Sequence, residues 1–129
     1  MSISNLLLTD INSVNIACNV TGAITGTTTL NLKRFDNIVY GTFATIAGSA
    51  NNTQPTITIT TTGTIPSRYL PVETFARPVS LVNIAVPVLG LVLVASNLST
   101  FTYSLSAGGN FNGNAAIKED VLLWKVNTV

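Results

Sequence analysis

Hydrophobic and polar positions alternate along much of the chain with the period of two that is typical of half-buried β-strands. The clearest run is 56–62 (TITITTT), where Ile57 and Ile59 share one face and threonines occupy the other. Residues 100–105 (TFTYSL) repeat the pattern with aromatic side chains. No helix-period segment of useful length interrupts these runs. The pattern predicts strands at 14–20, 26–32, 38–46, 56–62, 79–86, 89–95, 100–105 and 121–126.

Segments rich in glycine, asparagine and small residues separate these runs and indicate turns. A polar turn is expected at 33–37, and a tight turn at 87–90 (PVLG) should join two core strands. Residues 47–54 and 106–116 lack periodicity and are expected to be loops. About eight or nine short strands at this spacing predict an all-β fold, an antiparallel jelly-roll-like β-sandwich.

A proline-rich stretch, 63–78, divides the pattern in two. Pro66, Pro71 and Pro78 cannot donate ladder hydrogen bonds, and each favours extended geometry in the residue before it. We therefore expect a rigid, extended connector that is neither helix nor the middle of a sheet.

The chain is expected to consist of a short first segment and one domain. Residues 1–15 have apolar side chains at helix-like spacings, over a length too short to stand alone. They predict a stalk-proximal or connecting segment, with an edge strand as the alternative. Residues 16–129 are expected to form the β-sandwich head. The start lacks the basic region and cleavage pattern of a signal peptide, which predicts synthesis in the cytoplasm.

Composition predicts an oligomer. Hydrophobic residues make up 47% of the chain and charged residues 9%. A monomer of this kind would be poorly soluble, so we expect apolar surface to be buried between identical subunits. The uncharged run 79–95 agrees, because continuous apolarity in strands indicates that the core covers one face and a neighbouring subunit the other. Its length would also suit a membrane span, but Asn83, the break at Pro87 and many β-branched residues argue against insertion.

The inventory of reactive residues argues against catalysis, cofactors and metals. The chain has no histidine, one cysteine (Cys18) and five acidic residues, which is too few for most acid–base or transition-metal sites. Glu119 and Asp120 are adjacent and would point to opposite faces of a strand, so a paired-carboxylate glycosidase is a remote alternative. The net charge of +1 offers no basic patch for nucleic acid. We expect a protein that is not an enzyme and that has no cofactor, metal or nucleic-acid partner.

Surface recognition is the function that remains. Amide side chains hydrogen-bond sugar hydroxyls, and a loop aromatic can stack on a sugar ring. The alternative is that the Asn/Gly-rich segments are simply turns and that Phe111 folds back into the core. The candidate receptor contacts are Asn51, Asn52, Asn110, Phe111, Asn112 and Asn114.

Over residues 26–127, several motifs follow one another in a specific order. They are FDNIVY (35–40), IPSRYLP (65–71), PV (78–79), GLVLV (90–94), TFTY (100–103) and LLW (122–124). This order resembles that of the head domains of bacteriophage tail fibres and of fibres of some eukaryotic DNA viruses. Asp36 departs from the phage pattern, which usually has glycine before the asparagine of the first turn, but aspartate suits the same geometry.

The resemblance implies a homotrimeric jelly-roll head at the distal end of a viral fibre, on the virion surface. Its role would be attachment to a host-cell receptor, often a glycan. A purely structural virion protein, such as a capsid decoration protein with no receptor, is the alternative.

Overall fold

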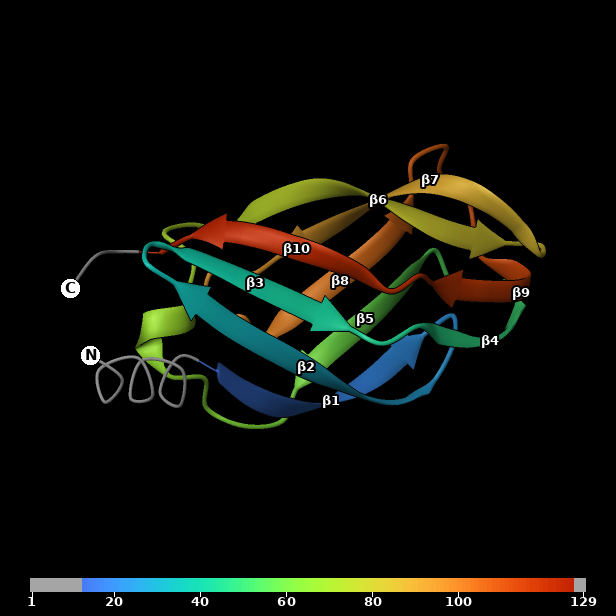
Figure 1. Ribbon diagram of the computed structural model, residues 1–129. Coiled ribbons are helices and arrows are strands. Elements are labelled where there is room, and N and C mark those ends of the chain that lie inside the picture. Colours follow the sequence, from blue (N-terminus) through green and yellow to red (C-terminus); the bar gives the residue numbers. More distant parts are fainter. Residues whose placement is uncertain (1–12, 127–129) are drawn as a thin grey trace.

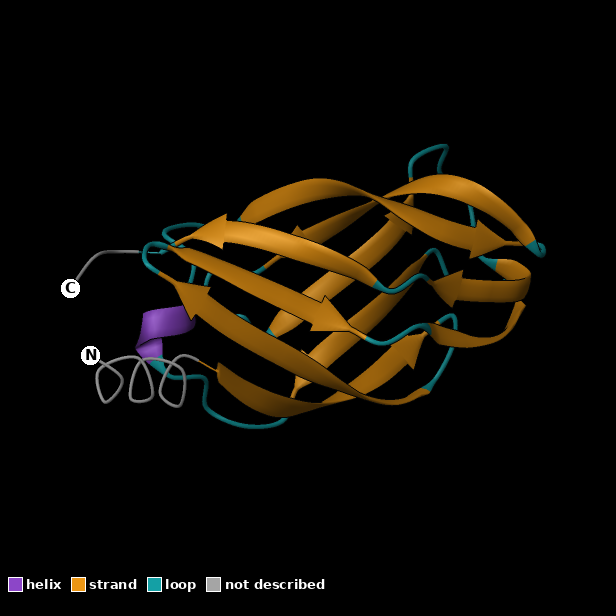
Figure 2. Ribbon diagram, in the orientation of Figure 1, coloured by secondary structure: helices purple, strands orange, loops and turns teal. Residues whose placement is uncertain are grey.

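The computed structural model describes residues 13–126, in which ten strands form one antiparallel sheet with almost no helix (Figures 1 and 2). The order across the sheet is β10-β3-β2-β1-β5-β8-β7-β6-β9-β4. The strands are β1 (Ser13–Gly22), β2 (Gly26–Phe35), β3 (Ile38–Phe43), β4 (Ile46–Asn51), β5 (Thr56–Thr61), β6 (Phe75–Asn83), β7 (Val86–Val94), β8 (Thr100–Leu105), β9 (Asn112–Ile117) and β10 (Asp120–Lys125).

The sheet curls until β10 approaches the start of β6, as Figure 1 shows along the upper side of the molecule. A β-bridge joins Pro71 to Val126. Close by, Nη2 of Arg77 donates a hydrogen bond to the carbonyl oxygen of Leu123 at 3.4 Å. The curled sheet therefore has an inner face that encloses the core and an outer face that surrounds it.

The inner face holds the residues that the alternating pattern predicts to be buried. Ile57, Ile59 and Phe101 are fully buried, and the ring of Phe101 meets that of Phe43 edge-on at 5.0 Å. The prediction of an all-β antiparallel fold is confirmed. The strands hydrogen-bond into one continuous sheet, and the jelly-roll detail stays a prediction.

Trp124 anchors the connector after β5 to the core. Its indole Nε1 donates a buried hydrogen bond of 2.7 Å to the carbonyl oxygen of Tyr69, whose side chain is itself buried. Gly41 makes room for the indole, because a Cβ there would lie 2.7 Å from Cη2 of Trp124. This contact fixes the connector from the inside.

The expectation that 63–78 is neither helix nor the middle of a sheet is wrong for two parts of the stretch. Ser67–Tyr69 form a short 3-10 helix, η1, and β6 begins at Phe75 with Pro78 inside it. Pro78 pairs with Leu91 of β7, whereas β6 meets β9 only at Leu81 and Val82. The missing N–H of Pro78 therefore falls on a stretch of β6 that needs no second partner.

The turn between the two apolar strands is also displaced. The tight turn lies at Ile84 and Ala85, both with positive φ (53° and 59°), and not at 87–90. Two consecutive left-handed residues make the hairpin turn that matches strand twist, although asparagine and glycine are the usual residues there. Pro87 pairs with Val82, while β8 joins β7 only from Gly90 onward. Pro87 is thus tolerated at an unpaired edge.

Two predicted loops contain strands. Residues 46–51 form β4 and 112–117 form β9, and the two strands pair with each other from Ile46–Ile117 to Asn51–Asn112. Small and polar side chains hide the period-two signal in both segments. Their strand geometry comes from mutual backbone pairing and not from side-chain pattern.

Residues 1–12, most of the predicted stalk-proximal segment, lie outside the described residues; Ser13–Asn15 belong to β1. The boundary between segment and head stays a prediction. In the part of the chain that the structure covers, no helix is long and apolar enough to cross a membrane.

The buried phenol of Tyr103 makes the unfolding free energy of the domain depend on pH in the alkaline range. Burial, with a smaller contribution from the Asp120 carboxylate, raises the pKa of its phenol above the ordinary tyrosine value. The unfolded chain therefore loses this proton first, so stability is complete below about pH 10 and falls as pH rises further. We expect wild type to lose about 1.4 kcal/mol more unfolding free energy than Tyr103→Phe between pH 9 and pH 11. Urea titrations of both proteins would measure this, and equal pH dependence would contradict it.

Candidate functional site

Five of the six candidate contacts predicted from the sequence are asparagines, and all five lie at one end of the curled sheet. This end, called the tip below, comprises the ends of β4 and β9 with the turns around them, at the right of Figure 1. Its residues are 51–54, 83–85 and 106–114, and none of them is charged. The tip is therefore a neutral, amide-rich surface.

Backbone hydrogen bonds hold the tip together. The β6–β7 turn lies against β9, with the Ile84 N–H donating to the Asn112 carbonyl and the Ala85 N–H to the Asn114 carbonyl, both at 3.0 Å. The Asn83 side chain accepts a 2.7 Å hydrogen bond from the Asn112 N–H. The side chains at the tip are thus carried on a bonded framework.

The amide side chains of the tip differ in whether they make hydrogen bonds within the protein. Asn110 donates from Nδ2 to the Asn52 carbonyl at 3.1 Å, Asn51 accepts from Thr53, and the Asn112 side chain accepts from the Gly113 N–H. Within residues 13–126, the exposed side chains of Asn52 and Asn114 make no hydrogen bond of their own. These two amides can therefore bind an external partner without loss of an internal bond.

Phe111 is a correction to the predicted contacts. Its side chain is fully buried, with its N–H donating to the Gln54 carbonyl at 3.0 Å. Its ring cannot stack on a sugar at the surface. The alternative considered for this residue, that it folds back into the core, is what the structure shows.

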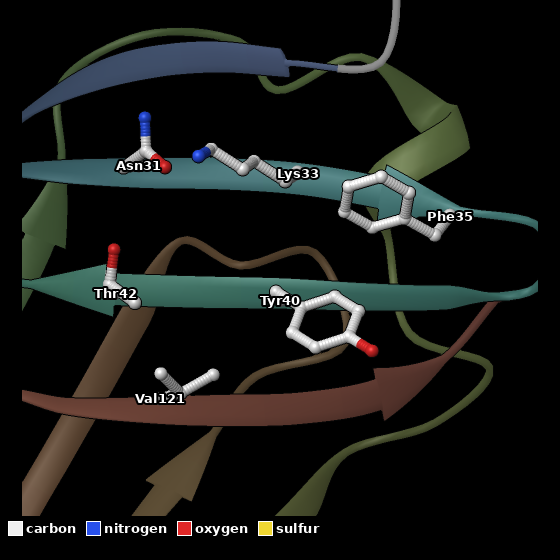
Figure 3. Close-up of a pocket in the computed structure, with 6 residues that line it drawn as sticks. All are labelled: Asn31, Lys33, Phe35, Tyr40, Thr42 and Val121. Atoms are coloured by element: carbon white, nitrogen blue, oxygen red, sulfur yellow. The ribbon is translucent and has the colours of Figure 1, made fainter. Parts of the chain in front are cut away.

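A second feature is a shallow hollow of about 280 Å³ on the outer face of β2, β3 and β10. Figure 3 shows its six side chains on the same side of three neighbouring strands. Phe35 and Tyr40 form its aromatic wall, with ring centroids 5.6 Å apart and planes at 87°. The lining residues are Asn31, Lys33, Phe35, Tyr40, Thr42 and Val121.

Sequence reasoning did not find the hollow. Lys33 and Tyr40 are direct cross-strand partners, as are Asn31 and Thr42, while Val121 comes from a strand near the end of the chain. The one signal in the sequence is the two-residue turn at 36–37, which joins the strand that ends at Phe35 to the strand that carries Tyr40 and so makes the two strands neighbours.

Neither surface carries the features of a metal or nucleophilic site. Across residues 13–126, no three His, Cys, Asp or Glu side chains gather closely enough to hold a metal ion. Cys18 is buried, and burial raises the pKa of its thiol, which keeps it protonated and unreactive. The exposed groups are amides, hydroxyls, aromatic rings and one lysine, which suit binding.

Comparison with known proteins finds similarity in structure only. No protein-family profile matches the chain, and no curated protein matches its sequence. The C-terminal receptor-binding domain of the avian reovirus fibre sigmaC matches with a TM-score of 0.52 at 14% identity, over 90% of this chain and 75% of that one. The reovirus attachment protein sigma1, solved in complex with alpha-2,3-sialyllactose, matches with a TM-score of 0.51 at 11% identity, over 91% and 68%.

At these identities the similarity concerns the fold. One of these two neighbours is the receptor-binding domain of a viral fibre and the other is a viral attachment protein, which agrees with the resemblance read from the order of motifs. The chain thus shares its fold with these two viral proteins.

Proposed function

We propose that this chain is the head domain of a viral fibre and attaches the virion to a receptor on the host-cell surface. The observation that carries the proposal is the fold shared with the receptor-binding domain of one reovirus fibre and with a second reovirus attachment protein. The jelly-roll-like head acts as a homotrimer on the virion surface. It binds and does not catalyse.

The tip is the surface that we assign to the receptor. β1 starts at Ser13 and ends at Gly22, and just beyond that end Ile24 lies against Gly48 of β4, the strand whose last residue, Asn51, lies at the tip. A ten-residue strand is about 30 Å long, so the chain enters the domain at the end remote from the tip (Figure 1). A fibre that continues from Ser13 would therefore present the tip outward.

A glycan is the receptor class that fits the tip best. The exposed Asn52 and Asn114 amides provide donors and acceptors for sugar hydroxyls, and the tip carries no charge. The sigma1 structure was solved with a sialyllactose glycan, which supports a glycan partner. Three tips on one trimer would compensate for weak individual contacts by raising the effective concentration.

Replacing Asn52 and Asn114 tests the assignment. We expect Asn52→Gly combined with Asn114→Ala to weaken binding to a glycan array at least about tenfold, since each amide supplies about one hydrogen bond. Glycine suits position 52 because Asn52 has φ 63°. Asn19→Ala is the matched control: its amide is exposed on β1, outside the residues that make up the tip, and binding should not change.

Binding that survives in the double variant would move the receptor site elsewhere. No binding by the wild-type trimer to glycans or to any cell surface would favour the structural virion role instead.

A further inference from the structure

Asn112 and Gly113 form an Asn–Gly pair at the tip. In the sequence, every other asparagine is followed by a residue that has a side chain. Asn112 is the first residue of β9, and Gly113 has φ 58°, a conformation that glycine adopts without strain. Both residues are partly exposed, so water has access to this part of the chain.

The backbone nitrogen of Gly113 lies against the side chain of Asn112. It donates a hydrogen bond of 2.9 Å to the side-chain oxygen Oδ1, which brings this nitrogen next to Cγ, the carbon that carries the oxygen. The side-chain nitrogen of Asn112, Nδ2, donates no hydrogen bond within residues 13–126. A nucleophile and the carbon that it can attack are therefore held together, and the nitrogen that would leave is not retained by the described part of the chain.

We propose that Asn112 is a modification site that deamidates spontaneously, through attack by the backbone nitrogen of Gly113. The Gly113 N–H gives its proton to a solvent base, and the nitrogen forms a bond to Cγ of Asn112. The bond from Cγ to Nδ2 then breaks, and ammonia leaves with a proton taken from solvent. The product is a five-membered cyclic imide. Glycine suits this step because it has no Cβ to crowd the nitrogen or to stop the backbone from bending.

Water opens the cyclic imide in one of two ways. Attack at Cγ breaks the bond from Cγ to the Gly113 nitrogen and gives aspartate. Attack at the main-chain carbonyl carbon gives isoaspartate, in which the backbone runs through Cβ and Cγ and is longer by one carbon atom. The whole conversion consumes one water and releases one ammonia, and nothing is oxidised or reduced. Either product places a negative charge on a tip that has none.

The longer backbone of isoaspartate disturbs the framework of the tip. The Ile84 N–H donates to the Asn112 carbonyl and the Ala85 N–H to the Asn114 carbonyl, both at 3.0 Å. An extra atom between these two carbonyl groups changes their spacing, so the two hydrogen bonds no longer form together. The consequence for attachment rests on the proposed function: this segment carries the Asn114 amide, so the conversion limits how long a tip stays competent to bind its receptor.

Prolonged incubation of the purified protein, followed by peptide mass spectrometry, tests the chemistry. We expect position 112 to gain about one dalton, at a rate that rises about tenfold for each unit of pH above neutral, because base removes the Gly113 proton. Asn112→Gln is the matched control: its longer side chain would have to close a six-membered ring, so its mass should not change. Asn52 and Asn114, followed by threonine and alanine, are internal controls and should remain amides while most of Asn112 is converted.

Hydrogen exchange tests the effect on the framework of the tip. After incubation, the N–H groups of Ile84 and Ala85 should exchange faster in wild type but not in Asn112→Gln, because only wild type loses the hydrogen bonds to β9. Glycan binding by wild type should decline in step with the converted fraction, while binding by the variant stays at its own starting level.

An Asn112 that keeps its amide, or that converts no faster than Asn52 and Asn114, would overturn the modification site while leaving the attachment function standing. Conversion with unchanged exchange at Ile84 and Ala85 would overturn its effect on the tip. A protein that converts as expected but binds no glycan or cell even when freshly prepared would instead contradict the proposed function alone.

Discussion

Phe101→Ala is expected to lower the free energy of unfolding by about 3–5 kcal/mol, the range for removing a large buried aromatic side chain. Phe101 is fully buried on β8, which lies between β5 and β7 in the sheet. Its ring packs edge-on against Phe43 of β3 at 5.0 Å, so it links strands on opposite sides of the curl. Alanine would leave a cavity that the rigid neighbouring strands cannot close.

Urea denaturation at neutral pH would measure this loss. Thr102→Ala is the matched control, because Thr102 is the next residue on the same strand and points to the outer face. It should change the unfolding free energy by less than about 0.5 kcal/mol. A loss of under about 1 kcal/mol for Phe101→Ala would contradict the assignment of this ring to the centre of the core.

Gly90→Ala is expected to destabilise the domain by about 3 kcal/mol, at the upper end of the range for overpacking. A Cβ at this position would lie 2.8 Å from the carbonyl oxygen of Ser104 and closer still to Cδ1 of Leu81. Leu81 is fully buried and Ser104 belongs to the neighbouring strand, so neither can move without disturbing the sheet.

The matched control is Gly63→Ala, since a Cβ at Gly63 would meet nothing within 4 Å. That variant should be neutral or slightly stabilising. The pair also separates two interpretations of residues 87–90. If they formed a surface turn, alanine at 90 would be tolerated, and a neutral Gly90→Ala would argue against the observed strand.

The alternating pattern of the sequence was sufficient to predict the fold class and the buried positions of the clearest strands. Alternation at 56–62 and 100–105 placed Ile57, Ile59 and Phe101 on the inner face, where the structure has them. The reason is that side chains in a strand point alternately to the two faces. A strand with one buried face therefore has an apolar residue at every second position of its sequence.

The amide-rich tip was predicted in part. Asn51 and Asn52 are about 60 residues from Asn110–Asn114 in sequence, yet both groups were proposed as contacts from residue type alone. The two groups lie together at the tip because β4 pairs with β9. The sequence could not show that Phe111 turns inward, because a lone aromatic between asparagines has no period.

The positions of the turns and the identity of the exposed apolar side chains follow from tertiary contacts and could not be predicted from the sequence. Strand assignment for β4 and β9, the turn at Ile84–Ala85, and Pro78 and Pro87 inside strands all depend on which backbone edge finds a partner. The sequence run 79–95 indicates burial on two faces, but the single subunit covers only one of them. Strand pairing and sheet curvature depend on contacts between residues that are far apart in the chain. The local pattern of hydrophobic and polar residues therefore does not predict them.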